Sequence, residues 1–106
     1  MPASAKASET LSGPNVVRAG HVFRLEVSVG DDAGARSAAS RLQERGPRGG
    51  YRWLGAWHRL RLSGGQPPDW ETYSFAVTEN RPGTYTFRAV LSTPYPSTYP
   101  VTVTVR

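Results

Sequence analysis

Residues 21–29 read HVFRLEVSV, and this stretch decides the fold class. Its apolar residues Phe23, Leu25, Val27 and Val29 alternate with charged or small polar residues. In an extended chain, alternate side chains point to opposite faces, so one face of this segment is apolar and the other is polar. The stretch therefore predicts a half-buried β-strand.

The same alternation returns in three later stretches of the chain. Residues 70–77 (WETYSFAV), 84–92 (TYTFRAVLS) and 99–106 (YPVTVTVR) all repeat apolar residues with a period of two. Glycine and proline mark turns at residues 64–69 and 79–83. About seven short strands at intervals of about ten residues predict an all-β sandwich of antiparallel strands.

Residues 35–45 fit two structures. The helical spacing i, i+3, i+4, i+7 is met by Ala35, Ala38, Ala39 and Leu42. Residues 40–45 (SRLQER) also fit a strand in which Leu42 points inward. We expect the strand, because the following sequence is β-patterned and a lone helix would need a packing layer of its own.

The length and the absence of cysteine limit how the chain is stabilised. A chain of 106 residues has room for one core, which we expect at residues 9–106 after a polar, flexible lead-in at residues 1–8. With no cysteine, the chain has neither disulfides nor thiolate chemistry, so burial of apolar side chains must stabilise it.

The net charge of +5 raises the question of nucleic-acid binding. The arginines are spread from Arg18 to Arg106 and mostly alternate with apolar residues, as on solvated sheet faces, so we expect no nucleic-acid partner. No apolar stretch is long enough to cross a bilayer, and residues 1–13 lack the apolar centre of a signal peptide. We therefore expect no membrane insertion.

The stretch at residues 82–88, PGTYTFR, resembles the G-x-Y-x-F signature of immunoglobulin-like and fibronectin-III-like domains. The resemblance implies an immunoglobulin-like β-sandwich in which Tyr85 is the corner tyrosine, with its hydroxyl bonded to upstream backbone. Over residues 14–106 the chain resembles bacterial immunoglobulin-like modules of secreted and surface proteins. That resemblance implies an extracellular, cell-surface or virion location, although the disulfide common in such domains is missing.

The sequence contains no recognisable catalytic or metal-binding pattern. His21 and His58 are the only histidines, and they do not have a metal-ligand spacing. No G-x-S-x-G elbow or phosphate-binding glycine loop is present. We therefore expect no enzymatic activity, no metal and no cofactor.

The aromatic residues are the strongest candidates for a binding site. One tryptophan, Trp53, is expected in the core of the sandwich. Trp57, Trp70 and Tyr95 lie where the β-alternation breaks down, so we predict that they line an exposed patch for a partner. The alternative is that these rings cap the ends of the sandwich.

Together these observations predict a non-catalytic binding or structural module. Its expected partner is a protein or a surface glycan, and it would act within a larger particle or a multidomain protein, for example as a virion decoration or tail-associated protein. A carbohydrate-binding module that uses exposed Trp and Tyr side chains is the alternative.

Overall fold

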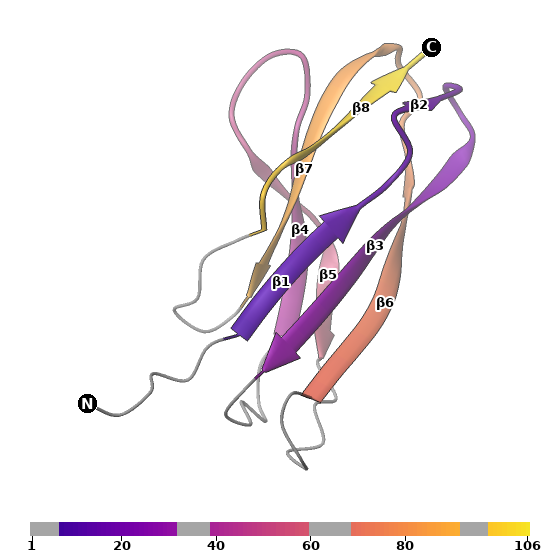
Figure 1. The fold of residues 1–106 in the computed structure, drawn as a ribbon. Helices are drawn as coiled ribbons and strands as arrows, with labels where there is room; N and C mark the ends of the chain where they lie inside the picture. The colour runs from indigo at the N-terminus through magenta and orange to yellow at the C-terminus, as the bar shows by residue number, and fades with distance from the viewer. Residues whose placement is uncertain (1–6, 32–38, 60–68, 92–97) are drawn as a thin grey trace.

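The computed structural model describes residues 7–31, 39–59, 69–91 and 98–106, and Figure 1 shows their arrangement. Within these residues the chain forms strands and no helix, in agreement with the predicted all-β class. The strands are β1 (Ala7–Ser12), β2 (Val16–Val17), β3 (Val22–Asp31), β4 (Ala39–Arg45), β5 (Arg52–Arg59), β6 (Asp69–Thr78), β7 (Gly83–Leu91) and β8 (Val101–Val105). No helix in the described part of the chain could therefore span a membrane.

Two sheets pack face to face (Figure 1). The three-stranded sheet has the order β1-β3-β6, and the five-stranded sheet has the order β2-β8-β7-β4-β5. The described strands pair antiparallel, except that β2 runs parallel to β8. This arrangement is an immunoglobulin-like β-sandwich.

The described residues contain eight strands, where the sequence predicts about seven. The difference arises at the N-terminal side, where β1 pairs with β3 in one sheet and β2 pairs with β8 in the other. Gly13, Pro14 and Asn15 separate them, and Pro14 has no N–H to donate to a ladder. β1 begins at Ala7, inside the segment 1–8 that the sequence predicts as a lead-in.

The core lies between the sheets and is built by the predicted alternation. Four residues of β3 are buried, namely Phe23, Leu25, Val27 and Val29, and they pack against the inner faces of β7 and β8. Residues 39–45 form a strand, as expected, with Leu42 buried. Residues 35–38, where a helix was the alternative, lie outside the described residues.

The prediction that Trp53 occupies the core is wrong. Its side chain is 45% exposed on β5, an edge strand, while its neighbour Leu54 points inward. The alternation does not carry through β5, because Gly55 has a φ of +73° and the register with β4 shifts between Ser40 and Leu42.

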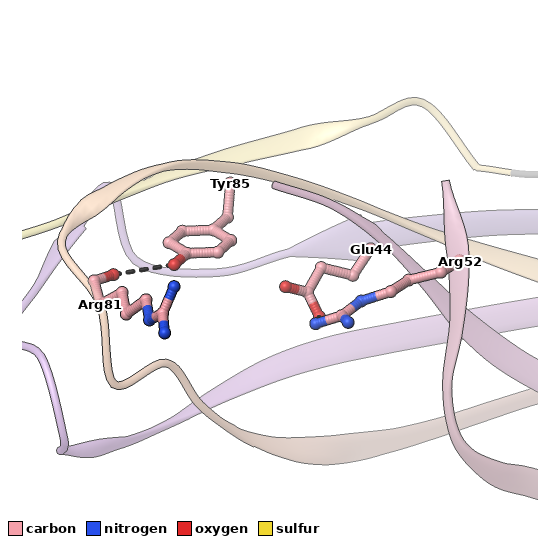
Figure 2. A network of polar contacts seen from close by, with 4 residues as sticks. All are labelled: Glu44, Arg52, Arg81 and Tyr85. Atoms are coloured by element: carbon pink, nitrogen blue, oxygen red, sulfur yellow. Dashed lines mark hydrogen bonds and ion pairs between the residues drawn. The ribbon is translucent and has the colours of Figure 1, made fainter. Parts of the chain in front are cut away.

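Tyr85 forms the predicted tyrosine corner. Its ring is buried, and its hydroxyl donates a hydrogen bond of 2.8 Å to the backbone carbonyl of Arg81 (Figure 2). Burial, and then the carboxyls of Glu79 and Glu44, raise the pKa of Tyr85 above its ordinary value, so the hydroxyl keeps the proton that it donates. The bond fixes the turn between β6 and β7 against the five-stranded sheet.

We expect Tyr85→Phe to lower the free energy of unfolding by about 1 to 2 kcal/mol, because the Arg81 carbonyl loses its donor while the ring packing is kept. Urea denaturation of the two proteins measures the difference. Tyr51→Phe, which alters a half-buried tyrosine outside the corner, is the matched control. An unchanged denaturation midpoint for Tyr85→Phe would contradict the corner role.

Candidate functional site

The outer face of the five-stranded sheet carries a row of large side chains. The β4 register places Gln43 opposite Trp53 of β5 on one side and opposite Arg88 of β7 on the other. Directly paired residues project to the same face, so these three side chains lie side by side across three strands. Arg88 Nε donates a 2.7 Å hydrogen bond to Gln43 Oε1.

Two tryptophans and an arginine form the first part of this surface. Trp53 and Trp57 are 45% and 43% exposed, with ring centroids 5.4 Å apart and planes tilted by 45°. The Arg41 guanidinium lies 4.9 Å from the Trp53 ring centroid and 6.0 Å from that of Trp57. Arg41 Nε also donates a 2.7 Å hydrogen bond to the Gly55 carbonyl, which holds the guanidinium against both rings.

A tyrosine between two further arginines forms the second part. The Arg88 guanidinium lies 3.8 Å from the centroid of the Tyr51 ring, and that of Arg45 lies 5.2 Å from it. Such cation–π contacts restrict long side chains that would otherwise be free in solvent. We call this surface the aromatic–arginine face and define it by Arg41, Arg45, Tyr51, Trp53, Trp57 and Arg88.

The aromatic–arginine face is cationic. Among the described residues of the five-stranded sheet, the only acid is Glu44, and its side chain is buried on the opposite, inner side. Arg59 pairs with Ala39 and therefore adds a further arginine on the outer side of β5. No carboxylate of the described sheet residues therefore offsets the positive charge of this face.

Of the three predicted site residues, only Trp57 has a side chain that the structure describes. Trp57 is exposed and belongs to the aromatic–arginine face. Trp70 lies in β6, a strand of the other sheet, and the structure does not describe its side chain. Tyr95 lies outside the described residues. The predicted grouping of all three therefore stays a prediction.

Sequence reasoning missed the arginines of this face and the role of Trp53. A signal for the arginines was present, because the strand reading of residues 40–45 already turned Arg41 and Arg45 outward. Their contacts with Trp53 and Tyr51 depend on which strands are neighbours, and this is known only from the register.

A pair of buried carboxyls lies on the inner side, near the tyrosine corner. Glu44 is 1% exposed and Glu79 is 9% exposed. Burial, a side-chain hydrogen bond with Glu44 and the charge of Glu44 raise the pKa of Glu79 from 4.5 to about 7, and Arg52 opposes this rise. Two carboxyls can hydrogen-bond each other only when one is protonated, and the raised pKa of Glu79 lets it keep this proton up to about pH 7.

His58 joins the two sheets at their edges. Its ring stacks on that of Tyr73 with centroids 3.8 Å apart, and its Nε2 lies 3.3 Å from Glu71 Oε2. This stacking of the two rings holds β5 against β6 and needs no ligand. In the part of the chain that the structure describes, no three His, Cys, Asp or Glu side chains come together as a metal site.

The fold and the exposed face define an immunoglobulin-like domain, and comparison with solved structures agrees on the fold. No family model matches the chain. No curated protein matches it either. The chain is similar to the CARDB domain of a Pyrococcus furiosus protein, crystallised in complex with di-metal ions, with a TM-score of 0.70, 18% identity, and coverage of 95% of this chain and 93% of that one.

Two enzymes also contain a similar fold. A β-glucosidase from Listeria innocua in complex with glucose matches with a TM-score of 0.72 and 15% identity over 96% of this chain, but over 16% of the enzyme. Superoxide reductase from Ignicoccus hospitalis matches with a TM-score of 0.58 and 17% identity, covering 96% of this chain and 82% of that one. At these identities the comparisons show the fold alone.

Proposed function

We propose that this chain is a non-catalytic immunoglobulin-like binding module that attaches to an acidic surface of a protein partner through the aromatic–arginine face. The observation that carries the proposal is the exposed Trp53–Trp57 pair with the Arg41 guanidinium against both rings. Tryptophan, tyrosine and arginine are the residues that most often dominate the binding energy of protein interfaces.

The geometry of the face supports this use in two ways. Hydrogen bonds to Gln43 and to the Gly55 carbonyl already hold Arg88 and Arg41 in place, so less side-chain entropy is lost on binding. The unopposed positive charge favours an acidic partner and speeds the encounter with it.

Carbohydrate binding has less support from the same residues. A sugar ring stacks on an open aromatic face, whereas the Arg41 guanidinium lies against both tryptophan rings. The two ring planes are tilted by 45° and do not form one flat platform. The arrangement therefore favours a protein partner over a neutral glycan.

Titration of the ¹⁵N-labelled domain with three probes, followed by NMR, separates the classes of partner. The probes are an acidic peptide of alternating Glu and Tyr, the neutral glucan cellohexaose, and an oligothymidylate. We expect the peptide to shift the indole N–H resonances of Trp53 and Trp57 and to bind more weakly as salt is raised. A stronger response to cellohexaose or to the oligonucleotide would contradict the proposal.

We expect Trp57→Ala to weaken peptide binding by about 2 kcal/mol, roughly thirtyfold, while lowering the free energy of unfolding by less than about 1 kcal/mol. The reason is that the Trp57 ring is exposed and packs on Trp53 and Arg41 and not in the core. Binding titrations and thermal melts of the same samples measure the two effects.

Val22→Ala is the matched control for this experiment. Val22 is an exposed apolar residue of β3, in the other sheet, so its loss should change neither binding nor stability appreciably. Parallel loss of binding and folding in Trp57→Ala would make Trp57 a packing residue and would remove the proposed site.

A further inference from the structure

A cavity opens beside the tyrosine corner, and its lining residues are different from those that define the aromatic–arginine face. It has a volume of about 460 Å³, and its lining includes Glu44, Tyr85, Arg48, Arg52 and Arg81. This volume falls within the range of small-molecule sites, about 300 to 1,000 Å³.

The two turns that border the cavity are packed tightly against each other. A Cβ atom at Gly83, where φ is +153°, would lie 2.7 Å from Pro47 Cγ, so only glycine allows this contact without a shift. The turn between β4 and β5 is thereby fixed against the turn between β6 and β7. The Tyr85–Arg81 hydrogen bond fixes the second turn from its other side. The cavity is a preformed feature of the fold.

The floor of the cavity presents a buried carboxyl that has few donors. Apart from a proton that Glu79 can share, neither Glu44 oxygen receives a hydrogen bond from the described residues, although the side chain is almost fully buried. Arg52 Nη2 lies 3.5 Å from Glu44 Oε2, and the Arg52 side chain is 73% exposed (Figure 2). A proton on Glu79 can fill one acceptor site of Glu44, and because a carboxylate has about four such sites, Glu44 can still accept from a further donor beside Arg52.

The rim of the cavity is cationic. Arg48, Arg52 and Arg81 contribute three guanidiniums, and Figure 2 shows those of Arg52 and Arg81 on either side of the Glu44 carboxyl. Three arginines exceed the charge of Glu44, even with Glu79 ionised as well. A simple cation is therefore disfavoured, and a carboxylate is the group that guanidinium forks bind best.

From this geometry we infer that the cavity binds a small carboxylate whose neighbouring carbon carries a hydrogen-bond donor, either a hydroxyl group or an ammonium group. The ligand carboxylate lies between the guanidiniums of Arg52 and Arg81. The adjacent hydroxyl or ammonium donates to one of the acceptor sites that remain on the Glu44 carboxylate. Sugar acids and α-amino acids both have this chemistry.

Calorimetric titration of the domain at pH 7 with four compounds tests the inference. Glucuronate supplies the carboxylate with hydroxyls, glycine supplies it with an ammonium, acetate has the carboxylate alone, and glucose has hydroxyls alone. We expect glucuronate or glycine to bind at least tenfold more tightly than acetate, with no binding of glucose. The preferred compound identifies the source of the donor.

Variants then place the binding in the cavity. Arg52→Gln and Arg81→Gln should each weaken binding at least tenfold, and neither should unfold the domain, because the Tyr85 hydroxyl bonds to the backbone carbonyl of Arg81 and not to its side chain. Arg24→Gln, which removes an equal charge from an exposed position on β3, is the control. Thermal melts confirm that each variant is folded.

Three outcomes would overturn the inference. The first is no saturable binding of glucuronate or glycine at millimolar concentration, and the second is equal binding of acetate. The third is equal weakening by Arg24→Gln, which would show that net charge alone attracts the anion. None of these outcomes bears on the aromatic–arginine face, whose peptide titration is a separate measurement.

Discussion

Replacement of Phe87 by alanine should lower the free energy of unfolding by about 3 to 5 kcal/mol. Phe87 is fully buried in β7, and its ring meets the edge of Phe23 with centroids 5.9 Å apart and planes at 72°. Alanine would lose this contact between the two sheets and leave a void that the rigid strands cannot close. Total stability is typically about 5 to 15 kcal/mol, so the variant would approach the limit of folding.

Urea denaturation of the wild type, Phe87→Ala and Phe87→Leu measures this effect. The leucine variant keeps most of the buried volume and should cost only about 1 to 2 kcal/mol. A similar cost for leucine and alanine would mean that the aromatic contact with Phe23 matters more than the filled volume. A cost below about 1 kcal/mol for alanine would contradict the central position of Phe87.

The domain should lose stability as the pH rises from 5 to 8, because of Glu79. Burial raises the pKa of Glu79 from 4.5 to about 7, so the folded state binds this proton more tightly than the unfolded state does. The resulting stabilisation is complete below pH 4.5 and is lost as the pH rises through 7. A shift of this size corresponds to about 3 kcal/mol.

Denaturation curves at several pH values, for the wild type and for Glu79→Gln, isolate this contribution. The glutamine amide can donate to Glu44 at every pH, so the variant should match the wild type near pH 5 and exceed its stability by up to about 3 kcal/mol at pH 8. Glu26→Gln, which removes an exposed carboxyl of β3, is the control and should keep the wild-type slope. Identical slopes for the wild type and Glu79→Gln would refute the assignment.

The strands on either side of the core could be predicted from the sequence because their alternation is unbroken. In β3, β7 and β8 the inward positions are apolar throughout, so the residues that the two-residue period turns inward are the ones that the structure buries. The strand at residues 39–45 could also be predicted from the sequence, because a single helix would have had no layer to pack against.

β5 could not be predicted in the same way. Its sequence RWLGAWHR has large residues on both faces, so alternation does not say whether Trp53 or Leu54 points inward. The position of β5 at the sheet edge decides the question, since its outer face is open to solvent. Edge position and the register shift between β4 and β5 are properties of the assembled sheet.

The buried carboxyls were missed although each of them continues an inward alternation in the sequence. Glu44 lies two residues after Leu42, so the strand alternation turns both inward. Glu79 lies one residue beyond β6 but continues its inward alternation after Val77, and only the tertiary fold brings it to Glu44. The cavity beside them likewise depends on two turns that are distant in sequence.

The parallel pairing of β2 with β8, together with the β1–β3 ladder, should resist mechanical tension between the two ends of the sandwich. Thr104 and Arg106 donate backbone hydrogen bonds to the carbonyls of Asn15 and Val17, and Ala19 donates one to Arg106. β1 begins toward one end of the sandwich and β8 finishes at the other (Figure 1). A pull along this axis would therefore load the β2–β8 bonds together, in shear, and would not open them one at a time.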